Sequence, residues 1–265
     1  MSLAINTNLE AINANRNLNS TENMLSHAMQ RLSSGLRINS AADDVAGYAI
    51  SQNLTGQVNG LNQATQNSQD AVSLAQTAQG SLSDVTQMLQ RIRELAVQYA
   101  NGTTSKSDQE AITSEVTQLT SEIERVGETT QFNGIQLLSV AATISFQVGA
   151  NDKEVIGVKT AVLKTAIEKK IELGTEKTLA GIDEAIAKVS ALAGEFGSVQ
   201  NRIQYTQANL EVYSQNLASA VSGIVDVNMA SEMTNFTKLQ VLQQAGVSVL
   251  AQANAQPQAV LKLLQ

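Results

Sequence analysis

The stretch that decides the fold is residues 182–224, IDEAIAKVSALAGEFGSVQNRIQYTQANLEVYSQNLASAVSGI. Apolar side chains recur there at alternating spacings of three and four residues, interrupted only by Thr206. The series is Ile182, Ala185, Val189, Leu192, Phe196, Val199, Ile203, Thr206, Leu210, Tyr213, Leu217, Ala220 and Ile224. This is the heptad pattern of a helix that packs along a partner helix. The sequence therefore predicts one long coiled-coil helix here.

A second heptad occupies residues 61–99, nearer the other end of the chain. Its positions are Leu61, Ala64, Ser68, Ala71, Ala75, Ala78, Leu82, Val85, Leu89, Ile92, Ala96 and Tyr99. An apolar seam of this length (the line of a and d positions) can be buried only against another helix. We therefore expect a mainly α fold, in which N- and C-terminal segments form a long antiparallel coiled coil or helical bundle.

Shorter elements are expected between the two seams. A helix is predicted over residues 105–126, ending at Gly127, because apolar side chains repeat on one of its faces. A turn is expected at residues 131–134. Residues 143–158 alternate apolar and polar side chains around a Gly-containing break, which predicts a small β-hairpin. The Lys-rich residues 159–177 are interpreted as a connector with some helix.

The two ends of the chain carry weaker helical stripes. The apolar positions are Leu18, Leu25 and Leu32 at one end, and Met229, Met233, Phe236, Leu239 and Leu242 at the other. Ordering a residue costs about 1–2 kcal/mol of backbone entropy. Because these stripes bury little apolar area, we expect both ends to be disordered in the monomer and to fold only against neighbouring molecules.

Composition excludes several classes of function. The net charge is −7, so there is no basic surface for nucleic acid. The chain has no Cys and one His, which leaves neither a thiolate site nor a two-His metal site. It contains no phosphate-binding glycine loop and no run of 18 apolar residues that would span a membrane. We expect no catalytic residues, no metal and no cofactor.

Adjacent carboxylates at Asp43 and Asp44 could suggest a metal site. Neighbouring residues of a helix point about 100° apart, however, so they would not converge on one ion. We interpret them as negative charges at the N-terminus of the first long helix, where they interact favourably with the helix dipole.

Several segments resemble the bacterial flagellins, in the order in which that family has them. They are Arg31-Leu32-Ser33-Ser34-Gly35-Leu36-Arg37-Ile38-Asn39-Ser40-Ala41-Ala42-Asp43-Asp44, Gln90-Arg91-Ile92-Arg93-Glu94-Leu95-Ala96-Val97, Gln131-Phe132-Asn133-Gly134, Phe146-Gln147-Val148-Gly149-Ala150-Asn151 and Val249-Leu250-Ala251-Gln252-Ala253-Asn254. The resemblance covers about residues 1–158 and 178–265. The chain departs from the family pattern at Gly223 and Val225, where Arg is common, at Asn228, where Asp is usual, and at Gln265, where Arg is common.

The resemblance implies a structural subunit that self-assembles into the extracellular flagellar filament used for motility. It implies terminal inner-core helices at 1–42 and 226–265, and an outer core at 43–158 and 178–225. The connector at 159–177 would stand in place of the family's hypervariable domains, giving a minimal core-only form. Export through the flagellar type III apparatus is implied as well, and it agrees with the absence of a signal-like N-terminus. The expected partners are further copies of the chain, an export chaperone, and cap and hook-associated proteins.

The resemblance also carries a binding surface. In flagellins recognised by Toll-like receptor 5, a Gln-Arg-x-Arg-Glu-Leu-Ala-Val stretch and a Glu of the following helix form the contact surface. The matching residues are Gln90, Arg91, Arg93, Leu95 and Glu115. The same surface packs subunits in the filament, and the two roles are compatible.

Two other functions remain open at this point. A hook–filament junction protein shares the terminal design, although the 31–44 and 249–254 segments favour the filament subunit. A secreted coiled-coil effector that inserts into host membranes is a second alternative. The absence of a long apolar segment argues against it.

Overall fold

The computed structural model describes residues 7–167, 173–174 and 178–263. Its elements, in chain order, are α1 (Leu9–Ser34), α2 (Val45–Tyr99), α3 (Lys106–Thr129), β1 (Gln131–Phe132), β2 (Ile135–Gln136), β3 (Thr143–Gln147), β4 (Val155–Lys159), α4 (Leu163–Ile167), α5 (Thr178–Val225) and α6 (Met229–Leu263). They form two compact units. One unit is Met1–Gly56 with Leu217–Gln265, and the other is Gln57–Asn216. The fold is mainly α with small hairpins, as the sequence predicts.

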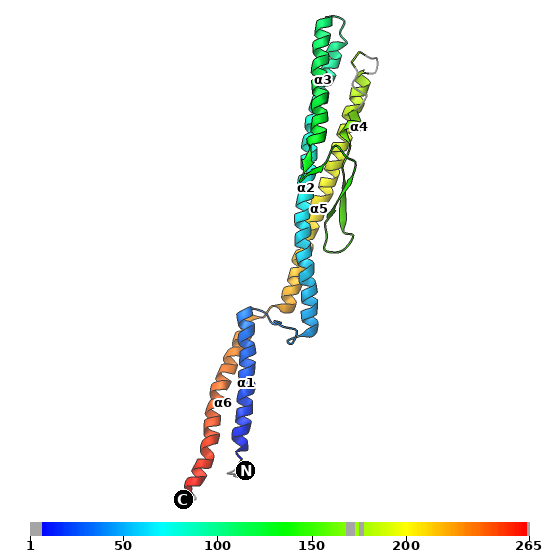
Figure 1. The fold of residues 1–265 in the computed structure, drawn as a ribbon. Helices are drawn as coiled ribbons and strands as arrows, with labels where there is room; N and C mark the ends of the chain where they lie inside the picture. Colours follow the sequence, from blue (N-terminus) through cyan, green and yellow to red (C-terminus); the bar gives the residue numbers. More distant parts are fainter. Residues whose placement is uncertain (1–6, 168–172, 175–177, 264–265) are drawn as a thin grey trace. The chain divides into compact units, whose positions relative to one another are not determined.

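Within the unit Gln57–Asn216, α2 and α5 lie side by side along their length (Figure 1). Near one end Arg93 Nε donates a hydrogen bond to Asp183 Oδ1, over 2.7 Å. Near the other end Ser214 Oγ donates to Asn62 Oδ1, over 3.2 Å. Residue numbers fall along α5 as they rise along α2, so the two helices run antiparallel. The predicted pairing of N- and C-terminal halves is confirmed.

The seam between these helices is closely packed on the α2 side. Every predicted seam residue from Leu61 to Ala96 is buried. Ser68, the polar member, is fully buried, and its hydroxyl donates to the carbonyl of Ala64 over 2.8 Å. A serine that bonds to the helix's own backbone adds no unsatisfied polar atom to the seam. The heptad therefore predicted both the helix and its buried face.

On the α5 side the buried seam is shorter than predicted. Its buried members are Ile182, Ala185, Val189, Phe196, Ile203 and Leu210. Tyr213 and Ala220 are exposed, so the expectation of a buried seam as far as Ile224 is wrong. At this level α5 still lies beside α2, since Ser214 Oγ donates to Asn62 Oδ1, but the seam positions beyond Leu210 are not buried.

Helix α3 begins with a capping box, in which Ser105 Oγ accepts from the backbone N–H of Asp108 and the Asp108 carboxylate accepts in return. It continues two residues past Gly127 to Thr129, so the predicted end at Gly127 is wrong. Gly127 is instead a packing position, since a Cβ there would lie 3.3 Å from Leu163 Cδ2 of α4. The glycine thus allows α4 to approach the helix.

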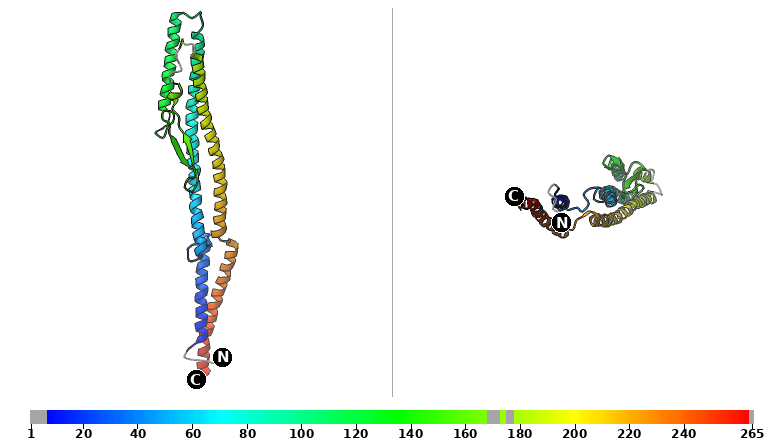
Figure 2. Two further views of the ribbon diagram at one scale, coloured as in Figure 1. Left: turned by 90° about the vertical axis from the view of Figure 1, so that its right-hand side faces the viewer. Right: turned by 90° about the horizontal axis from the view of Figure 1, so that it is seen from below.

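The predicted hairpin is present as β3 paired antiparallel with β4, with Phe146 opposite Ile156. It lies along the α2–α5 pair (Figure 2). Its tip is fastened to α2, where Asn67 Nδ2 donates to the carbonyl of Gln147 over 3.0 Å. Gly60 allows the close approach, because a Cβ there would lie 3.0 Å from Ala150 Cβ.

The expected turn at 131–134 joins a second, shorter hairpin, β1–β2. Asn133 and Gly134 both have positive φ, 48° and 79°, as a tight two-residue hairpin turn requires. In the connector at 159–177, α4 supplies the expected helix, and residues 168–172 and 175–177 lie outside the described residues. No helix within the described residues is long and apolar enough to cross a membrane.

Candidate interaction surfaces

The terminal helices α1 and α6 form a pair in the unit Met1–Gly56 with Leu217–Gln265 (Figure 1). At one end Asn8, the N-cap of α1, donates from Nδ2 to the carbonyl of Ala253 over 2.8 Å. Further along, a Cβ on Gly246 would lie 3.3 Å from Leu18 Cδ1. Since residue numbers rise in α1 as they fall in α6, this pair is antiparallel as well.

The contact between α1 and α6 is thin. Of the described residues in these helices, only Ala28, Leu239 and Ala253 are buried apolar residues. The predicted assembly residues divide into two sets. Half-buried in the pair are Leu18, Leu25, Leu32 and Phe236. Exposed are Met229, Met233 and Leu242. The structure therefore separates residues that pair the two helices from residues that face outward.

The loops that join these helices to α2 and α5 are bonded to each other. Leu36 forms an isolated antiparallel bridge with Asp226. The N–H of Val227 donates to the carbonyl of Gly35 over 3.0 Å, and the N–H of Arg37 donates to the carbonyl of Val225 over 2.6 Å. Gly35 ends α1 with φ of +73°, a conformation that glycine adopts without strain. We call the two bonded segments, 35–44 and 225–228, the loop joint.

The two acidic residues at the start of α2 have different roles. Asp44 Oδ1 accepts from the N–H of Gly47 over 3.0 Å and so caps the helix, in agreement with the expectation for this pair. Asp43 Oδ2 instead accepts from the N–H groups of Ser40 and Asn39, over 2.9 and 3.1 Å, inside the loop joint. These hydrogen bonds, with the charge of Arg31 as a smaller cause, lower the pKa of Asp43 from its ordinary value.

Asn228, one of the departures from the family pattern, still caps the start of α6. Asn228 accepts from the N–H of Ser231 over 3.2 Å at the start of α6. Asparagine and aspartate are about equally good N-caps, so Asn228 preserves the helix start without the charge. Beside this cap lies a feature that the sequence did not reveal. Arg31 Nε and Glu232 Oε1 are buried side-chain atoms without a hydrogen-bond partner among the described residues.

The predicted receptor surface is built around Arg91 on the exposed side of α2. Its guanidinium lies 3.1 Å from Glu115 of α3 and 3.2 Å from Glu94, one turn along α2. The hydrogen bonds to Glu115 and Glu94 raise the pKa of Arg91. Gln90 is exposed next to it. We call Gln90, Arg91, Glu94 and Glu115 the α2–α3 cluster.

The other two predicted residues lie elsewhere. Arg93 turns toward α5 and pairs with Asp183 over 2.7 Å, which raises the pKa of Arg93 and lowers that of Asp183. Leu95 is 2% exposed and belongs to the core beneath the helix. The structure thus brings Arg91 and Glu115 together, places Arg93 on another side of α2, and gives Leu95 a supporting position.

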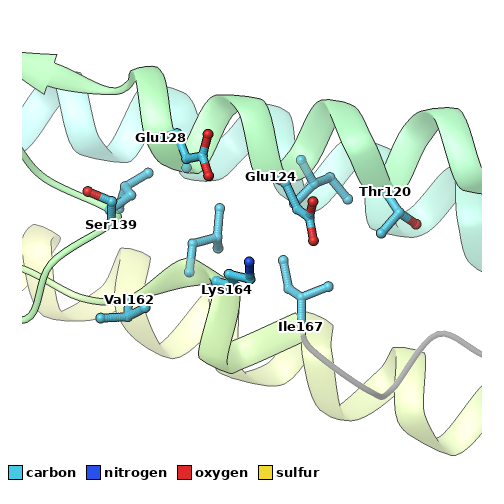
Figure 3. Close-up of a pocket in the computed structure, with 11 residues that line it drawn as sticks. Thr120, Glu124, Glu128, Ser139, Val162, Lys164 and Ile167 are labelled. Carbon is cyan, nitrogen blue, oxygen red and sulfur yellow. The ribbon is translucent and has the colours of Figure 1, made fainter.

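A cavity of about 240 Å³ lies between α3 and α4 (Figure 3). Its apolar lining includes Ile123, Leu138, Leu163 and Ile167. Glu124 and Glu128 of α3 and Lys164 of α4 extend toward it (Figure 3). The lining residues include neither histidine nor cysteine. No group of three or more potential metal ligands occurs among the described residues.

Two family descriptions match the chain. Residues 5–143 match "Bacterial flagellin N-terminal helical region", and residues 179–264 match "Bacterial flagellin C-terminal helical region". A flagellin of Halalkalibacterium halodurans is 46% identical over 272 residues, which cover 99% of this chain and all of the relative. A flagellin of Bacillus subtilis is 39% identical over 304 residues, with the same coverage of both chains.

Solved structures are similar as well. The crystal structure of Bacillus cereus flagellin gives a TM-score of 0.51 at 30% identity, covering 59% of this chain and 94% of that one. A putative flagellar hook-associated protein from Vibrio parahaemolyticus gives a TM-score of 0.59 at 14% identity, covering 69% of this chain and all of that one. At that identity the second likeness shows the fold alone.

Proposed function

This chain belongs to the bacterial flagellins, and we propose that its copies bind one another through the outward faces of α1 and α6. Members of this family are structural, non-enzymatic proteins that polymerise into the extracellular filament of the bacterial flagellum. The chain is therefore a filament subunit that self-assembles and serves motility. The proposal concerns which of its residues carry the assembly.

The supporting observation is the number of apolar side chains that the terminal pair leaves in water. They are Leu9, Ile12, Met24, Met29, Met229, Met233, Val241, Leu242, Val247 and Val249. Burial of apolar surface contributes about 25 cal/mol per Å², so the thin α1–α6 contact offsets little of the entropy cost of ordering two helices. Neighbouring copies that cover the outward side chains would supply the missing stabilisation, and would couple folding of the ends to polymerisation.

Polar substitutions on α6 test this proposal. Leu242 and Val249 lie two turns apart on one side of the helix and are both exposed. We expect the double variant Leu242→Gln, Val249→Gln to raise the critical concentration for polymerisation at least about tenfold. Each substitution would remove about 1–2 kcal/mol of the free energy gained by burying the apolar side chain against a neighbouring subunit. Gln244→Ser on the same helix is the matched control. Equal critical concentrations for the two variants would exclude this face as a contact.

We also propose that the α2–α3 cluster binds Toll-like receptor 5 when the monomer is released in an animal host, and that it contacts neighbouring subunits in the filament. Exposed arginine and glutamate side chains held by ion pairs offer directed charges at little entropic cost. Leu95 supports the proposal from beneath, because its packing fixes the part of α2 that carries Arg91.

A charge-reversal series tests the receptor contact. Arg91→Glu would place three carboxylates together with Glu94 and Glu115 and should lower the response of receptor-bearing reporter cells at least about tenfold. Arg125→Glu is the control, because Arg125 forms an exposed ion pair with Glu122 elsewhere on α3. Equal responses to both variants would show that the receptor does not read this cluster.

An export chaperone and the cap and hook-associated proteins are further proposed partners. The outward faces of α1 and α6 are their expected contacts, since these faces carry apolar side chains that require a cover before and during assembly. Deleting residues 229–265 should abolish co-purification with the chaperone. Retained co-purification would move the contact to another element. No observation favours the hook–filament junction protein or the membrane-inserting effector over a filament subunit.

For the division of labour along the chain we propose inner-core segments at 1–42 and 226–265 and outer-core segments at 43–158 and 178–225, with 159–177 as the connector. The boundaries between inner and outer core, at 42/43 and 225/226, fall at the loop joint. Packing divides the same helices at Gly56 and Leu217. The proposed boundaries mark where the chain turns between helices. The division at Gly56 and Leu217 instead separates groups of residues that contact each other.

A further inference from the structure

The methionines of this chain have an uneven distribution. The chain contains six methionines and no cysteine. Met88 is half-buried and packs against the core of the unit Gln57–Asn216. Met24 and Met29 of α1 and Met229 and Met233 of α6 are instead 47–55% exposed. The exposed methionines of the described chain are thus confined to the two terminal helices.

The antiparallel register brings three of these side chains, Met29, Met229 and Met233, toward one end of the pair. Glu22 lies opposite Gln243, whose Nε2 donates to its carboxylate over 3.5 Å. Counting from there, Met29 lies opposite residue 236, within about one turn of Met233, and Met229 lies one turn further along. Met24 lies further from the loop joint, near the middle of α1, and all four side chains are exposed on surfaces that the partner helix leaves uncovered.

We propose that oxidation of the four exposed methionines, Met24, Met29, Met229 and Met233, controls polymerisation. The proposal rests on the proposed role of α1 and α6 in assembly. The reagent class is a peroxide. A lone pair of the thioether sulfur attacks one peroxide oxygen, the O–O bond breaks, and the second oxygen leaves as water after proton transfer. The sulfur loses two electrons to become a sulfoxide, and the peroxide gains them.

The free subunit is the vulnerable form. No thiol in the chain competes for the oxidant, and the four thioethers are open to solvent. A sulfoxide is polar and accepts hydrogen bonds, so covering it with an apolar neighbour leaves its oxygen unsatisfied. Oxidised subunits are consequently excluded from the polymer, while subunits already assembled are shielded by their neighbours. Methionine sulfoxide reductases reverse the change at the expense of a thiol reductant.

Controlled oxidation of the full-length monomer tests the proposal. Filaments are dissociated by heat, treated with hydrogen peroxide, freed of peroxide and seeded at a range of concentrations. Peptide mass spectrometry should find sulfoxide at the four exposed positions before Met88. The critical concentration should rise at least about tenfold, as expected when a contact loses the burial of one methionine side chain. The variant M24L, M29L, M229L, M233L is compared with its own untreated baseline, and its critical concentration should be the same with and without peroxide.

Two results would overturn the proposal. One is normal polymerisation of wild-type monomer that carries the four sulfoxides. The other is equal peroxide sensitivity in the leucine variant, which would place the lesion at Met88 or elsewhere. Should the leucine variant fail to fold, sulfoxide reductase treatment of the oxidised wild type decides instead: polymerisation must return. Untreated wild-type protein is included in the same experiment. If it fails to polymerise, the proposed function is contradicted, and this result is separate from any effect of peroxide.

Discussion

Buried polar atoms have hydrogen-bond partners in the long α2–α5 seam but not everywhere in the described parts of the terminal helices. Inside the α2–α5 seam, the Ser68 hydroxyl is satisfied by the carbonyl of Ala64. In the terminal helices α1 and α6, Arg31 Nε and Glu232 Oε1 are buried without a hydrogen-bond partner in the described chain. An unsatisfied buried polar atom costs about 1–3 kcal/mol. The polar residue of the long seam therefore costs no unsatisfied hydrogen bond, whereas, among the described residues, the terminal helices each contain one buried polar atom that does.

The pKa of Asp43 predicts a pH dependence of the loop joint. Because folding lowers this pKa from its ordinary value of 3.8, the contribution of Asp43 to stability is fully present above that value. It is lost as the pH falls through the lower pKa of the folded state. We expect Asp43→Asn to be less stable than wild type at pH 7, and the difference to shrink as the pH drops below about 3.8.

Thermal unfolding of both proteins between pH 2 and pH 7, followed by circular dichroism, measures this difference in stability. The difference should begin to shrink at about pH 4. Asp152→Asn is a control, since Asp152 lies in the turn between β3 and β4 and belongs to the other unit. Parallel pH profiles for wild type and Asp43→Asn would mean that the Asp43 hydrogen bonds do not form in solution.

A second residue-level prediction concerns the β1–β2 turn. Gly134 has φ of +79°, where a side chain is strained. Gly134→Ala should therefore lower the free energy of unfolding by about 1–2 kcal/mol. Gly194→Ala in α5 is the control, because a Cβ there meets nothing within 4 Å, and helical propensity should make it neutral or stabilising. Urea denaturation of both variants measures the effect; a Gly134→Ala variant as stable as wild type would contradict the turn geometry.

At the scale of the elements, the heptad rule predicted what depends on periodicity. It predicted α2, α5 and their buried seam, because a strip of apolar residues 3.5 apart on average can be covered only by another helix. It could not predict where along a helix the apolar seam stops being buried by other elements. Tyr213 continues the pattern yet is exposed, and Gly127 looked like a helix end yet is a packing position against Leu163. The packing role of Gly127 depends on a distant segment, α4, which local spacing does not describe.

The candidate surface shows the same limit. The motif at 90–97 is contiguous in sequence, but positions two apart on a helix point about 200° apart. Arg91 and Arg93 accordingly pair with different helices, α3 and α5. The burial of Leu95 had a signal in the sequence, since it lies one helical turn after Ile92 of the seam. The contact between Arg91 and Glu115 was expected only from the family resemblance, because no local pattern relates the two residues.

Burial along α5 leads to a prediction for this element. Ile203 is fully buried, whereas Tyr213, at a later seam position, is exposed. Ile203→Ala should lower the free energy of unfolding by about 2–5 kcal/mol. Tyr213→Ala should change it by less than about 0.5 kcal/mol, although both residues occupy heptad positions. Chemical denaturation of the monomer separates the two. Equal losses would mean that the seam stays closed as far as Tyr213.

At the scale of the whole molecule, the chain combines a well-packed unit with a pair of helices that bury little of their own surface. The core of Gln57–Asn216 joins α2, α3, α5 and the hairpin in one apolar cluster. The terminal pair contributes few buried side chains and exposes many apolar ones. On the proposed assembly through α1 and α6, the unit Gln57–Asn216 would be stable alone and the terminal pair would complete its folding in the polymer.

Limited proteolysis of the dissociated monomer tests that contrast. Segments that bury little apolar surface open at low free-energy cost and are cut first. We expect a resistant fragment from about residue 43 to about residue 225, and rapid loss of the ends. In assembled filaments the same protease should leave the ends intact. Equal protection of the ends in monomer and filament would contradict folding upon assembly.

The most direct test of the account is electron microscopy of the purified chain after heat dissociation, cooled with short filament seeds. Self-assembly through the terminal helices predicts long, regular filaments that elongate from the seeds, and none from a chain that lacks residues 226–265. Protein that remains monomeric, or that caps the seeds without elongating them, would contradict it. Filament growth by the truncated chain would equally contradict the role given to α6.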